Sequence, residues 1–278
     1  MKMRHFKIIL FNLFLILAVV VVLYPILLMF MDSFKTAAEL SSNPAWVPLK
    51  PTVDNYINLY RYNRGQIVQT FINSVYVTLV HTAFVLVISS LAAFAFAKYE
   101  FKGKNIIFSA LLMTMMIPGE LLIPPLYIML AKIGWISTYK IQIIPGVAKV
   151  MSLFLLRQYM LSIPDSLIEA AKLDGAGHFR IYSRIIMPTS VPALATVAIL
   201  EFLYKWNDYL WPLLMVNNPA KLPIMVILPT LTTDGNLFSI PWELVLTGCV
   251  VATIPIMVMF LCFSDKVMSG MTLGAVKE

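Results

Sequence analysis

Long hydrophobic runs alternate with short polar segments along the whole chain. A run of about 20 apolar residues is long enough to cross the hydrocarbon core of a bilayer as an α-helix. Runs of this kind cover residues 8–31, 71–97, 105–130, 141–161, 190–210 and 244–263. The pattern therefore predicts an all-α polytopic membrane protein with six transmembrane helices.

The third and fourth runs each contain a Pro-Gly pair. The third is interrupted by Pro118-Gly119-Glu120 and by Pro124-Pro125, and the fourth contains Pro145-Gly146. A broken helix at membrane depth needs protein groups or a water-filled cavity to satisfy its freed backbone groups. These two breaks therefore predict irregular backbone inside the protein rather than against lipid.

The polar segments predict the orientation of the chain. Lys2, Arg4 and Lys7 precede the first run, and a basic turn at residues 98–104 follows the second. Because cytosolic flanks are rich in Lys and Arg, we expect both termini in the cytosol. Residues 32–69 and 212–243 are then expected on the outer side.

Composition agrees with this interpretation. The chain is 60% hydrophobic and 13% charged, against about 25% charged in a soluble domain. The net charge of +7 fits basic membrane flanks better than nucleic-acid binding. We expect one transmembrane domain over 1–278, with a first span and outer segment (1–68), a five-span core (69–264) and a cytosolic tail (265–278).

A polar island at residues 162–190, here called the central segment, stands between the fourth and fifth runs. Ser162, Pro164 and Asp165 have the spacing of a capping box at a helix start. Leu167, Ala170, Ala171 and Asp174 are expected on one face of a short helix that ends at Gly175. The segment is either an ordinary cytosolic loop or a docking site, in which the adjacent alanines permit close approach and Glu169 offers a charge.

The order of residues in the central segment resembles the EAA loop of bacterial ABC-importer membrane subunits. Glu169-Ala170-Ala171, Gly175, Ile185 and Pro188 all occupy the positions of that pattern, and Met187 stands where the pattern has Leu. The resemblance implies that Glu169, Ala170, Ala171, Asp174, Gly175 and Pro188 dock an ATPase subunit.

Two further stretches resemble the carbohydrate-importing, maltose-importer type of this family. They are the tail Gly270–Lys277 and the fifth-run segment Lys205–Pro212, and together with the stretch at Asp54-Asn55-Tyr56 they extend the resemblance over roughly residues 50–278. In that family the tail reaches between the ATPase subunits, which implies contacts by Thr272, Gly274 and Lys277. The resemblance also implies a homologous second permease subunit, two cytosolic ATPase subunits that carry ATP and Mg²⁺, and an extracytoplasmic solute-binding protein.

Charged residues in the fifth run are the main candidates for a substrate pathway. Glu201, Lys205 and Asp208 recur at helical spacing, and ionisable groups at membrane depth usually face the bundle interior or a cavity. They form either a structural ion-pair ladder or, with Trp206, Asn207 and Trp211, the outer mouth of a sugar path. Asn73, Glu120 and Gln142 are further candidates, whereas His81 is expected to be a hydrogen-bonded residue between helices.

The outer loop contains a turn at residues 232–236. It is either a solvated turn or, as the resemblance to related importers implies, a contact with the binding protein through Thr233, Asp234 and Asn236. The sequence contains no phosphate-binding Gly-x-x-x-x-Gly-Lys motif and no metal-ligand motif. We therefore expect no catalytic residues, no metal and no cofactor bound by this chain.

These observations indicate a permease subunit that imports an oligosaccharide or related carbohydrate across the bacterial cytoplasmic membrane. An importer of glycerol-phosphate or another polyol is the alternative within this class. A secondary transporter that uses Glu201, Lys205 and Asp208 as an ion relay is the alternative from a different class.

The predicted topology can be tested by cysteine labelling. Lys172→Cys and Gly235→Cys, each in a chain with Cys249 and Cys262 replaced by serine, should react with impermeant reagents from opposite sides of the membrane. Position 172 should be cytosolic and position 235 extracytoplasmic. Labelling of both from the same side would exclude this topology.

Overall fold

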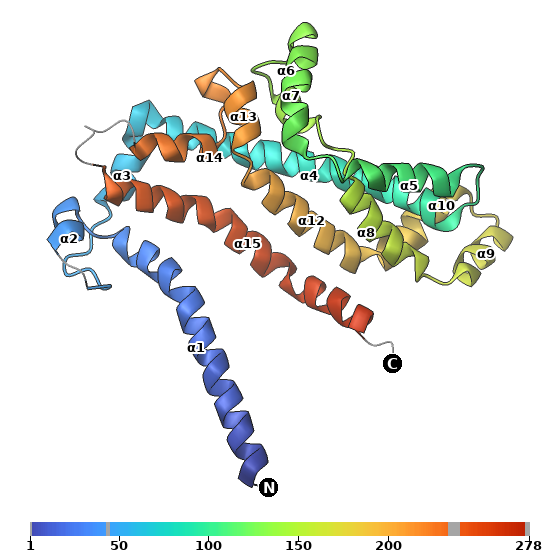
Figure 1. The fold of residues 1–278 in the computed structure, drawn as a ribbon, viewed down its shortest axis with the longest axis horizontal. Coiled ribbons are helices and arrows are strands. Elements are labelled where there is room, and N and C mark those ends of the chain that lie inside the picture. The colour runs from blue at the N-terminus through green and yellow to red at the C-terminus, as the bar shows by residue number, and fades with distance from the viewer. Residues whose placement is uncertain (1, 43–44, 233–239, 276–278) are drawn as a thin grey trace. The chain divides into compact units, whose positions relative to one another are not determined.

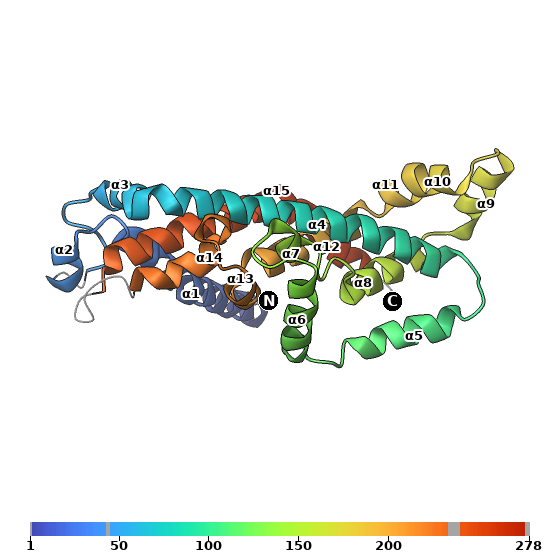
Figure 2. The same ribbon diagram turned by 90° about the horizontal axis from the view of Figure 1, so that it is seen from above.

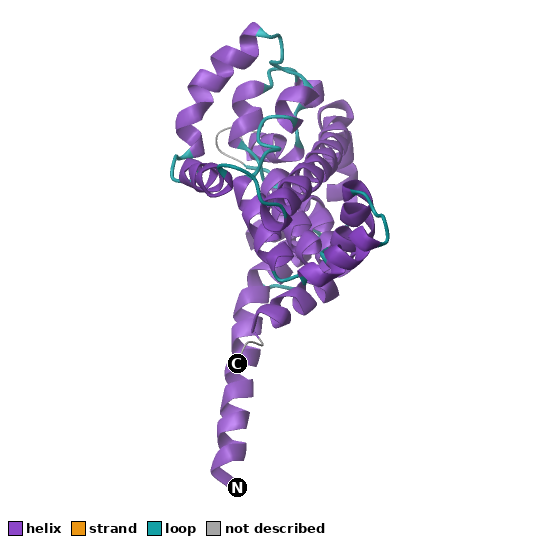
Figure 3. Cartoon of the chain, turned by 90° about the vertical axis from the view of Figure 1, so that its right-hand side faces the viewer, coloured by secondary structure: helices purple, strands orange, loops and turns teal. Residues whose placement is uncertain are grey.

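The computed structural model describes residues 2–42, 45–232 and 240–275, and in these ranges the regular structure is entirely helical (Figure 3). Contacts divide the chain into two compact units. Unit 1 comprises residues 1–69 and 227–254, and unit 2 comprises residues 70–226 and 255–278. The single domain expected from the sequence stays a prediction, and each unit is described on its own.

Unit 1 contains the first hydrophobic run. Its helices are α1 (Lys2–Asp32), α2 (Ala37–Ser42), α3 (Asp54–Arg61), η1 (Tyr62–Gly65), η5 (Leu228–Thr232) and the first part of α15 (Trp242–Ala275). None of the apolar window of α1 is buried inside the chain. A helix of this length with exposed apolar side chains suits a lipid-facing span.

A buried asparagine fixes the turn after α1. Asn55, which is 4% exposed, donates its amide hydrogens to the carbonyls of Ser33 and Lys35 at 2.8 Å. The hydroxyls of Ser33 and Tyr56 lie 2.8 Å apart. These bonds satisfy carbonyls of the turn that follows α1. They give a structural role to the Asp54-Asn55-Tyr56 stretch.

Unit 2 contains the broken runs and the central segment. Its elements are α4 (Gln66–Lys98), α5 (Lys104–Thr114), η2 (Gly119–Leu122), α6 (Ile123–Lys132), α7 (Tyr139–Ile143), α8 (Val150–Leu161), α9 (Asp165–Leu173), α10 (His178–Ile181), η3 (Tyr182–Ile186), α11 (Met187–Thr189), α12 (Val191–Trp206), α13 (Leu210–Met215), η4 (Pro219–Lys221), α14 (Ile224–Ile227) and the last part of α15. Helix α12 packs along α8 (Figure 1).

The helix lengths agree with a polytopic membrane protein. In the described part of the chain, three helical stretches are long and apolar enough to cross a bilayer: Ile8–Asp32, Asp54–Lys98 and Trp242–Phe263. Two bent pairs raise the number to as many as five, and α8 is a shorter apolar helix. One pair, α5 with η2–α6, bends by 90° at Pro118-Gly119 (Figure 2), as the sequence predicts.

The central segment is anchored to unit 2 by apolar contacts and by one lysine. Ile168, Ala171 and Ile181 are buried in a core cluster with residues of α4, α8 and α12. Lys98, at the end of α4, donates to the Ile163 carbonyl at 2.5 Å and pairs with Asp165 at 2.7 Å. The hydrogen bond from Lys98 lowers the pKa of the Asp165 carboxyl. Because this pKa is lowered, the carboxylate stays charged and the ion pair persists as the pH falls through the usual carboxyl pKa. The pair is lost only at a lower pH.

Two predictions for this segment are wrong. The capping box does not form, because Ser162 donates to the Tyr159 carbonyl and α9 begins at Asp165 without a side-chain cap. The expected shared face also divides. Ala171 is 9% exposed and packs inside this chain, while Leu167, Ala170 and Asp174 are exposed. Of the alanine pair, only Ala170 faces outward.

The orientation of the two alanines predicts that the same substitution destabilises the protein at one position and not at the other. Ala171→Leu should overpack the core beneath α9 and cost about 1–3 kcal/mol of stability. Ala170→Leu should leave the melting temperature of the purified chain nearly unchanged, because its side chain points away from that core. Equal destabilisation by the two changes would contradict the described face of α9.

Candidate functional site

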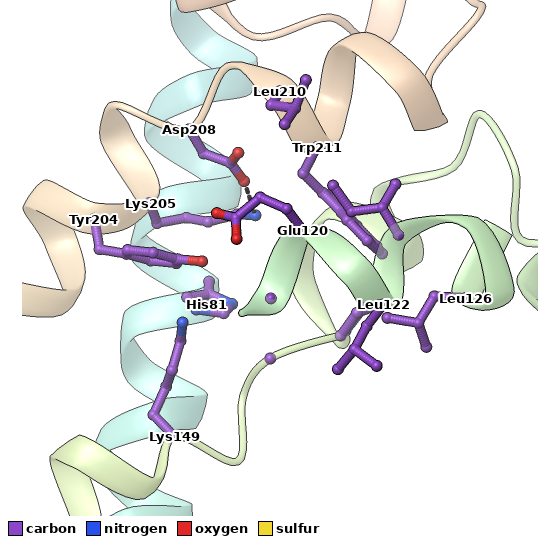
Figure 4. A pocket seen from close by; sticks show the side chains of 14 residues that line it. His81, Glu120, Leu122, Leu126, Lys149, Tyr204, Lys205, Asp208, Leu210 and Trp211 are labelled. Carbon is purple, nitrogen blue, oxygen red and sulfur yellow. Dashed lines mark hydrogen bonds and ion pairs between the residues drawn. The ribbon is translucent and has the colours of Figure 1, made fainter. Parts of the chain in front are cut away.

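A cavity of about 300 Å³ lies inside unit 2, where the broken third and fourth runs meet the end of α12. Its walls come from α4, the η2–α6 break, the α7–α8 link and the α12–α13 turn (Figure 4). Polar or aromatic side chains that line it are His81, Glu120, Lys149, Tyr204, Lys205, Asp208 and Trp211. The irregular backbone predicted at the two breaks thus borders a cavity.

Helix α7 positions two of these side chains through its free carbonyls. Pro145 has no N–H group, so the carbonyl of Ile141 lacks its helical partner. The indole nitrogen of Trp211 donates to this carbonyl at 2.8 Å. The helix ends at Ile143, and the carbonyl of Ile143 lies 2.8 Å from Nδ1 of His81. The predicted hydrogen-bonded role of His81 between helices is confirmed.

The predicted charge ladder is only half formed. Lys205 and Asp208 pair at 2.7 Å, with side chains 6% and 16% exposed. Glu201 instead accepts a hydrogen bond from the Ser152 hydroxyl at 2.5 Å. One carboxylate oxygen of this α12 glutamate is therefore bonded by α8 rather than by Lys205, while its Oε2 is buried without a hydrogen-bond partner among the described residues. The Lys205–Asp208 pair borders the cavity, whereas Glu201 is absent from its lining.

Lys149 and Glu120 complete the charged lining. The ammonium of Lys149 lies 3.5 Å from the ring centroid of Tyr204, a cation–π contact. Glu120 is exposed within the break of the third run and lines the cavity beside Lys205, Asp208 and Trp211 (Figure 4). Two lysines and two carboxylates therefore border the same space.

The structure separates the fifth-run candidates into two groups. Lys205, Asp208 and Trp211 line the cavity. Trp206 is 1% exposed, stacked on Phe202 with ring centroids 5.8 Å apart, so its expected place at an outer mouth is wrong. Asn207 is exposed and donates to the carbonyl of Leu203, outside the cavity lining. The rotation of successive residues about the helix axis explains this separation.

Asn73 and Gln142 have structural partners. Asn73 donates to the carbonyls of Ala220 and Leu222 at 2.9 Å, and Gln142 donates to that of Lys221 at 3.1 Å. These bonds hold the η4 region against α4 and α7.

The central segment presents a second candidate surface. Glu169 and Ala170 are exposed on α9, and Asp174 is exposed directly after it. Gly175 has a φ of +75°, which confirms the predicted turn. Pro188 is exposed in the first turn of α11.

Two apolar side chains on this surface were missed by the sequence interpretation. Leu173 is 89% exposed and Phe179 is 76% exposed. Both flank the Gly175 turn. Their presence as large apolar residues in a polar segment was the sequence signal that could have identified this surface. Together with Glu169, Ala170 and Asp174 they form what we call the docking face.

Other predicted site residues fall at the limits of the described chain. Thr233, Asp234 and Asn236 of the outer loop, and Lys277 of the tail, lie outside the described residues. Thr272 and Gly274 lie within the backbone of α15, which continues to Ala275. Their proposed contacts stay predictions.

Comparison with known proteins shows the family. Residues 85–268 match the family described as binding-protein-dependent transport system inner membrane component. The arabinooligosaccharides transport system permease protein AraQ of Halalkalibacterium halodurans is 33% identical over 261 residues, covering 92% of each chain. The sn-glycerol-3-phosphate transport system permease protein UgpE of Brucella abortus is 31% identical over 266 residues, covering 94% of each chain.

A solved structure shares the fold. It is the crystal structure of a bacterial ABC transporter involved in the import of the acidic polysaccharide alginate, with a TM-score of 0.83 at 23% identity. The match covers 94% of this chain and 96% of that one. The chain therefore belongs to the family of binding-protein-dependent transport system inner membrane components. Its resemblance to the membrane subunits of carbohydrate ABC importers is confirmed.

The buried ion pair at the cavity gives a testable prediction. Lys205→Met leaves the Asp208 carboxylate without its partner, which should cost about 3–5 kcal/mol and lower the melting temperature of the purified chain. Adding Asp208→Asn should restore most of that loss, because no uncompensated charge remains. Glu201→Gln should not rescue Lys205→Met, since Glu201 bonds to Ser152 instead. Rescue by Glu201→Gln would contradict this description and indicate that Glu201, Lys205 and Asp208 form one ion-pair ladder.

Proposed function

We propose that this chain is the membrane-spanning permease subunit of an ATP-driven bacterial importer for an oligosaccharide or related carbohydrate. The observation that carries the proposal is the docking face. It exposes Leu173, Phe179 and the Glu169 carboxylate, while the opposite side of α9 is anchored in the core of unit 2. A partner protein is the natural cover for such a surface.

The partner proposed for the docking face is an ATPase subunit. When two ATPase subunits bind ATP and Mg²⁺ and close, their movement would displace α9 through this contact. This chain would itself bind neither ATP nor Mg²⁺. Since α9 packs on residues of α4, α8 and α12, a displacement of α9 would be passed to those helices. The ATPase contact must differ between the two states to shift the equilibrium between them.

The proposed topology has six spans, with both termini and the central segment in the cytosol. Three long helices, the bent pair of α5 with η2–α6, and α12 from the second bent pair support five of these spans. The first half of that second pair, His178–Thr189, belongs to the central segment. The sixth corresponds to the fourth run, where α7 and α8 lie on either side of Pro145-Gly146. The proposed location is the bacterial inner membrane, with a homologous second permease subunit and an extracytoplasmic solute-binding protein as further partners.

The substrate class is proposed from the relatives and from the cavity. The arabinooligosaccharide relative supports a carbohydrate, whereas the glycerol-phosphate relative supports the polyol alternative. Asp208, Lys205 and Trp211 offer the carboxylate, ammonium and aromatic surface that recognise hydroxyl-rich rings. An ion-coupled carrier is a poorer proposal, because it needs no docking face and because Glu201 is not linked to Lys205.

Two neighbouring glycines provide a matched test of coupling. An added Cβ at Gly175 or at Gly177 meets no atom within 4 Å, but only Gly175 has a positive φ, of +75°. Gly175→Ala should therefore strain the turn of the docking face, by about 1 kcal/mol. It should reduce ATPase retention and uptake, whereas Gly177→Ala should behave as the wild type.

Charge reversal tests the same surface without backbone strain. Glu169→Lys should leave insertion and melting temperature intact, because the side chain is exposed. It should reduce co-purification with the ATPase. The loss of binding free energy should be about 2–5 kcal/mol if the partner charge is desolvated in the interface. Normal uptake by both Glu169→Lys and Gly175→Ala would exclude the docking face from energy coupling.

A further inference from the structure

We propose that the cavity in unit 2 is a binding subsite for one uncharged sugar ring, with His81 accepting a hydrogen bond from a sugar hydroxyl. This inference rests on the proposed import of a carbohydrate. It adds that the carbohydrate is uncharged and that His81 recognises it. It places direct substrate contact in this chain rather than only in a partner permease.

The unpartnered nitrogen of His81 is the first observation. His81 is 1% exposed, and its Nδ1 lies 2.8 Å from the Ile143 carbonyl. A carbonyl only accepts, so Nδ1 carries the proton and donates, and Nε2 of the neutral ring is an acceptor. Within the described part of the chain, Nε2 is buried and has no hydrogen-bond partner. A buried acceptor without a partner costs about 1–3 kcal/mol, which a ligand hydroxyl would recover once the side chains that cover Nε2 move aside.

The balance of charge around the cavity is the second observation, and it favours an uncharged ligand. The Lys205 ammonium is already paired with Asp208 at 2.7 Å, and that of Lys149 lies over the Tyr204 ring. Glu120 and Asp208 add two carboxylates to the same lining. A phosphate or uronate would meet these carboxylates while both lysines are already engaged. Hydroxyl groups, in contrast, donate to carboxylates and accept from ammonium groups equally well.

The aromatic wall and the size of the cavity are the third observation. Trp211 is held at the cavity by its bond to the Ile141 carbonyl, so its ring is fixed before a ligand arrives. An immobilised aromatic face suits the C–H surface of a sugar ring at little entropic cost. The volume of about 300 Å³ is at the lower end of small-molecule sites, which span about 300–1,000 Å³. One ring of an oligosaccharide is therefore the expected occupant.

Two substitutions separate recognition by Nε2 from a purely structural role of the imidazole. Asparagine places an N–H group near Nδ1, so His81→Asn keeps the donor to Ile143 and removes the acceptor in the cavity. Glutamine reaches the position of Nε2 with an oxygen, so His81→Gln keeps the acceptor and loses the bond to Ile143. Thr82→Val is the matched control, because Thr82 is the next residue of α4, is also buried with an unpartnered oxygen, and does not line the cavity.

The experiment uses the complete importer, with both permeases, the ATPases and the binding protein, in proteoliposomes. Radiolabelled arabinotriose, trehalose and maltose serve as uncharged probes, and sn-glycerol 3-phosphate as the anionic probe. Uptake is measured at saturating binding protein, and retained probe is counted in complexes arrested with vanadate. Melting temperature is recorded for every variant.

The proposal predicts that the wild type carries an uncharged probe and that His81→Asn retains about 3- to 10-fold less of it, the range expected for one hydrogen bond. Its melting temperature should stay at the wild-type value, and Thr82→Val should retain the probe. His81→Gln should also retain the probe but with a lowered melting temperature, because it leaves the Ile143 carbonyl without its donor. Normal retention by His81→Asn with wild-type uptake would overturn the subsite alone. Transport of sn-glycerol 3-phosphate only, or of no probe, would overturn the proposed carbohydrate function and the subsite with it.

Discussion

The cavity depends on one constraint of membrane interiors, which is that every backbone carbonyl released by a broken helix must find a donor in the protein or in a water-filled cavity rather than in lipid. Pro145 removes the N–H group that would bond to Ile141, and the end of α7 releases Ile143. Side chains from α13 and α4 provide the two missing donors. The break in the helix therefore both opens space and determines which rings face it.

The central segment follows a different physical rule, because it lies outside the hydrophobic runs. Its inward side is held by apolar burial, and its outward side exposes Leu173 and Phe179. Lys98 connects the first residues of the segment to the end of a long helix, with only 2% of its own side chain exposed. Such a buried lysine, bonded to a carbonyl and a carboxylate, fixes where α9 begins although no capping box forms.

Much of the fold was predictable from the sequence, because hydrophobic runs and helix breakers are strong local signals. The bend at Pro118-Gly119 and the turn at Gly175 were both expected from residue type alone. The site was predictable only in part. Periodicity placed Lys205 beside Asp208, but it could not show that Glu201 bonds to Ser152 on another helix, or that Trp206 packs on Phe202. Those outcomes depend on contacts between segments about 50 residues apart or on the exact rotation of α12, which the sequence pattern does not specify.

The attachment of His81 and Trp211 to the same short helix has a consequence for motion. Helix α7 has only five residues, and two rings carried by different helices, α4 and α13, both donate to its carbonyls. A tilt of α7 during the transport cycle would carry the imidazole and the indole in concert, so that both walls of the cavity change together. Ligand capture and release would then depend on the position of one short helix.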